Sequence, residues 1–128
     1  MEYSIPKKIF IVDDDEMLTE ALSDYLKRST AHQITCFATG EECLKHLHEN
    51  PDIIILDYYL NTVQKDAANG MEILKMIKKN YPVHVIMLSS QEQYGIAMQT
   101  IQKGAEQYVI KDEDAFEKIA KMINSTRF

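Results

Sequence analysis

The sequence predicts an α/β fold, namely a five-stranded parallel sheet, doubly wound, with five helices on its two faces. The first observation is that short apolar runs alternate with helical apolar patterns along the whole chain. The second is that these runs are continuously apolar, as in strands covered on both faces. The third is that the connections are too short to contain a second domain. We therefore expect one domain spanning residues 1–128.

The first half of the chain is expected to contain two strands and two helices. The strands are the apolar runs at 9–12 and 34–37. The helix between them is marked by apolar residues at helical spacing, at Leu18, Ala21, Leu22, Tyr25 and Leu26. Gly40 opens a shorter helix, which Asn50 and Pro51 end.

The second half continues the alternation with three strands, at 53–56, 83–88 and 108–110. A polar segment, 58–69, follows the first of these. The helices are marked by three further apolar stripes: Ile73, Leu74 and Ile77; Tyr94, Ala97, Met98 and Ile101; and Phe116, Ile119, Ala120 and Ile123.

Charge and composition exclude several classes of function. The chain carries 14 basic and 20 acidic side chains, for a net charge of -6. Because non-specific nucleic-acid binding relies on Lys and Arg, we expect no direct binding of nucleic acid. No apolar run approaches the ~20 residues of a membrane span. Cys36 and Cys43 lack the spacing of a zinc or redox motif. We expect a cytoplasmic protein.

Polar and charged side chains follow four of the predicted strands. They are Asp13, Asp14, Asp15 and Glu16 after the first strand, Asp57 after the third, Ser89 and Ser90 after the fourth, and Lys111 after the fifth. In doubly wound sheets, ligands bind beyond the carboxyl ends of the strands. If these ends face one crevice, it holds several carboxylates, a hydroxyl and an amine.

Such a crevice suits magnesium and phosphoryl chemistry. Crowded carboxylates repel one another, and a hard divalent cation relieves the repulsion. Asp57 is then expected to be a nucleophile that forms an acyl phosphate. Ser89 and Lys111 are expected to hold the remaining phosphoryl oxygens.

Simpler interpretations exist for single residues. Asp15 or Glu16 would cap the first helix, where acids complement the helix dipole. Ser89 and Lys111 taken alone are common surface residues. Tyr108 taken alone is a core aromatic residue. The functional interpretation rests on several of these residues lying at strand ends.

Four motifs carry a family resemblance. They lie at 9–15 (IFIVDDD), 54–57 (IILD), 86–90 (IMLSS) and 104–111 (GAEQYVIK). In this order they resemble the response-regulator receiver family of two-component signalling, from about residue 8 to about residue 124. The resemblance implies a CheY-like fold with strand order 2-1-3-4-5.

The resemblance also implies a role for each matching acid. Asp57 corresponds to the phosphoacceptor, and Asp14 to the direct magnesium ligand. Asp13 would act largely through coordinated water, and the backbone carbonyl of Tyr59 would be another ligand. Mn²⁺ is expected to substitute for Mg²⁺. The implied phosphoryl donor is a sensor histidine kinase, a phosphotransfer protein or a small acyl phosphate.

The remaining matches imply a switch. Ser89 corresponds to the hydroxyl that moves toward the phosphoryl group, Tyr108 to the aromatic residue that then swings inward, and Lys111 to the lysine that binds the phosphoryl group. The surface formed by the helix at 91–103, the fifth strand and the last helix would change. A downstream protein or a second copy would read it. Tyr59 and Gln91 would flank the path of attacking water, and we hypothesise that Tyr59 slows hydrolysis.

Two features depart from the family pattern. Twelve residues, 58–69, separate Asp57 from Gly70, an apparent insertion of about five residues without proline. We hypothesise that this loop forms a lid or a partner-reading surface. In addition, Asp112 follows Lys111 where the family usually has a proline after a cis bond. Because a cis bond before a non-proline residue costs about 2.5–4 kcal/mol, we expect a trans bond.

Three other functions are compatible with parts of the pattern. Asp13 and Asp15 form the Asp-x-Asp of a haloacid-dehalogenase-like phosphatase, with Asp13 as nucleophile, although Met17 does not fit that motif. A flavodoxin-like cofactor binder would need phosphate-binding amides where the acids stand. The third alternative is a degenerate receiver that acts only as a docking module.

Overall fold

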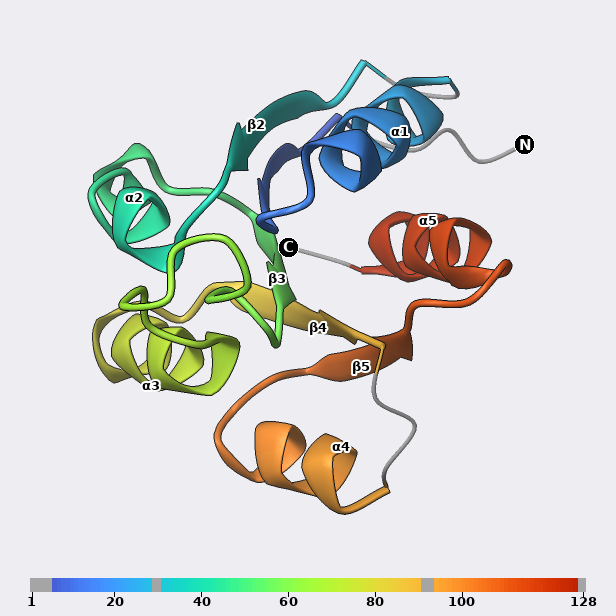
Figure 1. Cartoon of the computed structure of the whole chain (residues 1–128). Coiled ribbons are helices and arrows are strands. Elements are labelled where there is room, and N and C mark those ends of the chain that lie inside the picture. The colour runs from blue at the N-terminus through green and yellow to red at the C-terminus, as the bar shows by residue number, and fades with distance from the viewer. Residues whose placement is uncertain (1–5, 29–30, 91–93, 127–128) are drawn as a thin grey trace.

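The computed structural model describes residues 6–28, 31–90 and 94–126, and it contains one parallel sheet between two layers of helices (Figure 1). The order of the strands is β2-β1-β3-β4-β5, and every neighbouring pair is parallel. The strands are β1 (Lys8–Val12), β2 (Gln33–Phe37), β3 (Ile53–Asp57), β4 (His84–Ser89) and β5 (Gln107–Ile110). The predicted fold class and strand order are confirmed.

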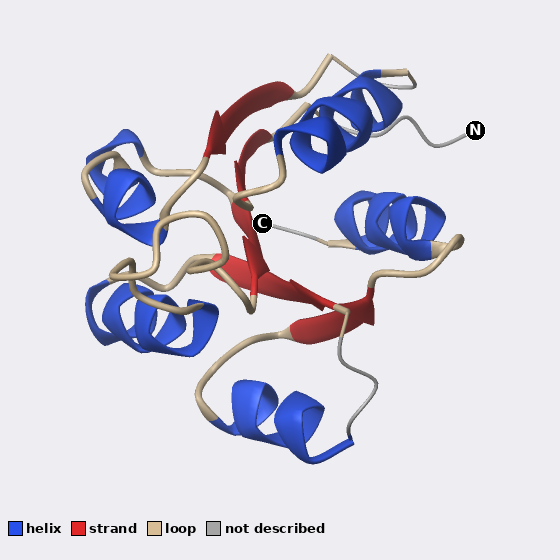
Figure 2. Cartoon of the chain, viewed as in Figure 1, coloured by secondary structure: helices blue, strands red, loops and turns tan. Residues whose placement is uncertain are grey.

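Helices follow the strands in regular alternation (Figure 2). They are α1 (Glu16–Lys27), α2 (Gly40–Leu44), α3 (Gly70–Asn80), α4 (Tyr94–Gln102) and α5 (Ala115–Ser125), with a 3-10 helix, η1 (Leu47–Glu49), after α2. Figure 1 shows α1 and α5 on one side of the sheet and α2, α3 and α4 on the other. None of the helices in the described part of the chain is long and apolar enough to cross a bilayer.

The alternation of side chains along each strand builds two cores. In β1, Phe10 and Val12 join the cluster beneath α2 and α3, whereas Ile9 and Ile11 join the cluster beneath α1 and α5. Successive side chains of a strand point to opposite faces. A strand covered by helices on both faces is therefore apolar at every position, which explains the continuous apolar runs.

Side-chain caps fix where the helices begin. Asp15 accepts hydrogen bonds from the backbone N–H groups of Met17 and Leu18 and so caps α1, as one of the simpler interpretations of the acidic run expected. Asn69 and Glu72 form a capping box at the start of α3. The helix predicted after Gly40 is shorter than its pattern suggested, because α2 ends at Leu44 and the chain continues into η1.

Gly70 lies at a close approach of two backbone segments. Its N–H donates to the carbonyl of Tyr58 at 2.7 Å, which closes the base of the 58–69 loop. A Cβ atom at this position would lie 2.2 Å from the carbonyl oxygen of Asp57. Glycine therefore allows α3 to start directly beside the end of β3.

Candidate functional site

Three carboxylates meet at the carboxyl edge of the sheet. Asp13 directly follows β1, Asp14 comes next, and Asp57 ends β3. Because β1 and β3 are neighbours with Val12 opposite Leu56, the residues that follow are also adjacent. One oxygen from each of the three carboxylates lies within 4.8 Å of the others. Sequence reasoning therefore predicted this juxtaposition correctly.

Lys111 supplies the positive charge at this edge. Its Nζ atom lies 2.9 Å from Oδ2 of Asp13 and 3.2 Å from Oδ1 of Asp57. Its backbone N–H donates to the carbonyl of Ser89 at 2.8 Å, which fixes the start of the segment after β5. The bond between Lys111 and Asp112 is trans, as expected. The long side chain of Lys111 thus reaches the two carboxylates without the proline typical of the family.

The neighbours of Asp57 control its protonation. Burial, followed by the negative charge of Asp13, raises the pKa of Asp57 to about 7, against the opposing effects of Lys111 and of a hydrogen bond from the backbone N–H of Tyr59. Burial would lower the pKa of Lys111, but hydrogen bonding and charge from Asp13 and Asp57 raise it. Without a further cation, the site therefore cannot easily keep both Asp13 and Asp57 ionised.

The donor set fits a divalent cation. Asp13 and Asp57 are each only 2% exposed. Oδ2 of Asp13 is the one buried side-chain N or O atom in the described part of the chain that has no hydrogen-bond partner, although Lys111 forms an ion pair with it. Oxygen ligands of this kind are those that Mg²⁺ and Mn²⁺ take in proteins. The residues present are therefore suited to hold such an ion.

Ser89 and Tyr108 lie beside the carboxylates. Ser89 ends β4 and is completely buried. Tyr108 lies on β5, where burial raises the pKa of its phenol and a hydrogen bond with Ser89 opposes that effect. The two residues predicted to move together are thus in direct contact. Gln91, the other predicted tuning residue, lies outside the described residues.

The sequence did not reveal one set of contacts at the site. The backbone N–H of Thr62 donates to Oδ2 of Asp14 at 3.1 Å, and that of Val63 donates to the same oxygen at 3.3 Å. The hydroxyl of Thr62 donates to it as well. The 58–69 segment has no apolar periodicity, so its sequence offered no signal for these contacts beyond its unusual length.

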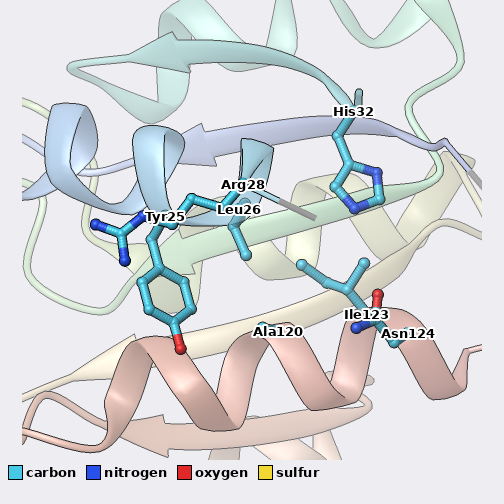
Figure 3. Close-up of a pocket in the computed structure, with 7 residues that line it drawn as sticks. All are labelled: Tyr25, Leu26, Arg28, His32, Ala120, Ile123 and Asn124. Carbon is cyan, nitrogen blue, oxygen red and sulfur yellow. The ribbon is translucent and has the colours of Figure 1, made fainter. Parts of the chain in front are cut away.

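A cleft of about 220 Å³ lies elsewhere, between α1 and α5 (Figure 3). His32 lines it and directly precedes β2, so the cleft lies toward the amino ends of the strands. Its other polar lining residues include Arg28 and Asn124. Because parallel sheets bind ligands at the opposite edge, the acidic cluster is the stronger candidate site.

The structure is a doubly wound α/β domain with buried acids and a lysine at the carboxyl edge of its sheet. Comparison with family models narrows this class, because the model of the response regulator receiver domain matches residues 9–124. The chain therefore belongs to the response regulator receiver family. The resemblance noted from the four sequence motifs is confirmed.

Solved structures agree with this assignment. The BeF3-activated receiver domain of DrrB is 28% identical, has a TM-score of 0.78, and is matched over 92% of this chain and 95% of that one. The DrrB regulator of Thermotoga maritima, an OmpR/PhoB homolog, is 28% identical with a TM-score of 0.77, over 91% of this chain and 50% of that one.

A third solved structure shares the fold of this chain. The Mn²⁺-bound form of the response regulator Rcp1 is 24% identical with a TM-score of 0.74, over 93% of this chain and 90% of that one. At this identity the comparison shows the shared fold alone. The chain is a signalling receiver domain, and its acidic cluster is consistent with the divalent-metal pocket of the family.

Proposed function

We propose that this chain is a phosphorylation-dependent signalling switch that accepts a phosphoryl group on Asp57. The donor is a phosphohistidine of a sensor kinase or phosphotransfer protein, or a small acyl phosphate. Magnesium is held by Asp13, Asp14, Asp57 and the backbone carbonyl of Tyr59, with Mn²⁺ as a substitute. The observation that carries this proposal is the meeting of the three carboxylates within 4.8 Å.

The chemistry follows from the charges in the site. A carboxylate oxygen of Asp57 attacks phosphorus, an aspartyl O–P bond forms, and the P–N bond to the donor imidazole breaks. The donor histidine keeps the electron pair of that bond. When bound, magnesium would orient the phosphoryl oxygens and offset their charge. Lys111, already 3.2 Å from Oδ1 of Asp57, pairs with a phosphoryl oxygen.

The switch is proposed to pass from Ser89 to Tyr108. Phosphorylation draws the Ser89 hydroxyl toward the new phosphoryl oxygens, which breaks its present hydrogen bond with Tyr108. Tyr108 then occupies the space that Ser89 leaves. The surface of α4, β5 and α5 changes shape, and a downstream protein or a second copy of the chain binds the changed surface.

Four further expectations stay proposals. Residues 1–128 act as one receiver unit without direct nucleic-acid contact, in the cytoplasm. Tyr59 slows hydrolysis of the acyl phosphate, so Tyr59→Ala is expected to shorten its lifetime. The backbone N–H of Tyr59 bonds to Asp57, which supports a place for this residue beside the reacting group.

Acetyl phosphate labelling tests the proposal. Wild type incubated with acetyl phosphate and Mg²⁺ should gain one phosphoryl group by intact mass, and peptide mapping should place it on Asp57. Asp57→Asn, or wild type with EDTA, should gain none. Absence of label on the wild type with Mg²⁺, from acetyl phosphate or any histidine kinase, would instead favour a docking module.

The same experiment separates the phosphatase alternative. If Asp13 were the nucleophile, the label would map to Asp13, Asp57→Asn would keep it, and the protein would turn over phosphate esters many times. Membership of the receiver family favours Asp57. Repeated turnover of an exogenous phosphate ester would contradict the proposal.

A further inference from the structure

The 58–69 loop is fixed to the rest of the fold at three positions. At its base, Gly70 donates a hydrogen bond to the carbonyl of Tyr58. In its first half, Leu60 is completely buried in the core beneath α2 and α3. Toward its end, the N–H of Ala68 donates to Oε2 of Glu41 at 2.9 Å. The loop is therefore built into the fold, and its middle is held against Asp14, one of the three clustered acids.

The middle of the loop binds one particular oxygen. All three hydrogen bonds from Thr62 and Val63 go to Oδ2 of Asp14. No residue in the described part of the chain donates a hydrogen bond to the other oxygen, Oδ1. A carboxylate with one oxygen saturated by donors and the other unengaged resembles a metal ligand whose orientation is fixed by an outer shell of hydrogen bonds.

We propose that Thr62 is a positioning residue for the metal site, which holds Asp14 so that Oδ1 faces the cation. This proposal rests on the proposed function, because it assumes that Asp14 binds the ion. Loop closure and metal binding then stabilise one another, since each is stronger when the other is present. The 58–69 loop would in this way set the affinity of the site for the metal ion.

The charge balance supports the same arrangement. Three donors on Oδ2 withdraw charge from Asp14 and reduce its repulsion of Asp13 and Asp57, so the cluster can persist with its ligand atoms within 4.8 Å. In the opposite arrangement, Thr62 competes with the cation for Asp14. Oδ2 would then be the metal-binding oxygen, and the cation would have to displace Thr62 from it. The two arrangements predict changes of opposite sign in the same measurements.

The first measurement is Mg²⁺ affinity by isothermal titration calorimetry. Thr62→Val removes the hydroxyl and keeps the branched shape, and we expect it to weaken Mg²⁺ binding about tenfold, at the lower end of known outer-shell effects. Thr62→Ser keeps the hydroxyl and should restore near wild-type affinity. Gln64→Ala, an exposed change in the same loop, should leave affinity unchanged. Tighter binding by Thr62→Val would overturn the proposal, as would unchanged affinity.

The second measurement is amide hydrogen exchange in wild type with and without Mg²⁺. The N–H groups of Thr62 and Val63 both donate to Asp14, so Mg²⁺ should slow their exchange. Faster exchange with Mg²⁺ would mean that the cation displaces the loop. Failure of the proposed function is a separate result, because wild type would then bind no Mg²⁺ at all, whatever residue occupied position 62.

Discussion

At the scale of single residues, Asp57 is a carboxyl group whose surroundings oppose its ionisation. Burial and the charge of Asp13 raise its pKa to about 7, so the metal-free protein carries a partly protonated Asp57 at neutral pH. Only the carboxylate form can act as a nucleophile or a metal ligand. A divalent cation held by Asp13, Asp14 and Asp57 would therefore favour the carboxylate form of Asp57, which is the form that the proposed function needs.

The raised pKa predicts how stability depends on pH. The native state binds more protons than the unfolded chain between about pH 4 and pH 7, so the free energy of unfolding falls as pH rises through this window. Asp57→Asn has no carboxyl group at this position, so its stability lacks this dependence on pH. In EDTA, we expect Asp57→Asn to be more stable than wild type by about 2–4 kcal/mol at pH 8 and nearly equal to it at pH 4. Urea unfolding at both pH values measures this, and an advantage independent of pH would contradict it.

Gly70 is the second residue whose replacement has a defined consequence. A Cβ atom there would lie 2.2 Å from the carbonyl oxygen of Asp57, a backbone atom that can move only with β3. Gly70→Ala should destabilise the protein by about 1–3 kcal/mol, as overpacking does.

The control for Gly70→Ala is Gly95→Ala. Gly95 lies in α4, and among the described residues no atom outside its chain neighbours and its own helix backbone lies within 4 Å of a Cβ built there. That change should stabilise the protein by about 0.5–1 kcal/mol, because glycine is a poor helix former. Urea unfolding at one pH compares the two, and equal effects would mean that the close approach at Gly70 is not the cause.

At the scale of elements, the sequence located the strands, the helices and the bounds of the 58–69 loop, but not the contacts that the loop makes. All five strands were placed to within one residue, because each contains a short stretch that is rich in apolar or β-branched residues. The strand ends directed attention to Asp13, Asp57 and Lys111. The 58–69 loop has no such pattern, and its conformation depends on contacts with Asp14 and Glu41 that are remote in the sequence. Neither periodicity nor motif spacing records contacts of this kind.

Leu60 provides a test of how the loop is anchored. Its side chain is completely buried in the core beneath α2 and α3, although it belongs to a polar segment. Leu60→Ala should lower the free energy of unfolding by about 2–4 kcal/mol, as for other large core residues. Val63→Ala, in the same loop at 71% exposure, should change it by less than about 0.5 kcal/mol. Chemical denaturation of the two variants decides, and similar small losses would show that the loop is not anchored.

At the scale of the whole molecule, ligand binding is expected to add to stability by mass action. On the proposed function, Mg²⁺ would bind only the folded cluster, because Asp57 is remote from Asp13 and Asp14 in an unfolded chain. At a hundredfold excess over its Kd, it should add about 2.7 kcal/mol to the free energy of unfolding. Thermal unfolding with EDTA and with Mg²⁺ measures the shift. Asp14→Asn is the control and should respond less, so an equal response would place the ion elsewhere.

The carboxyl edge of the sheet gathers charged groups that follow β1, β3 and β5, which are far apart in the sequence. Asp13 follows the first strand and Lys111 follows the last, and the two meet only when β1, β3, β4 and β5 have aligned. During synthesis, a ribosome-bound chain that has not yet released its final strand lacks the lysine that pairs with both acids. On the proposed function, competence to accept a phosphoryl group would therefore arise only after β5 has joined the sheet.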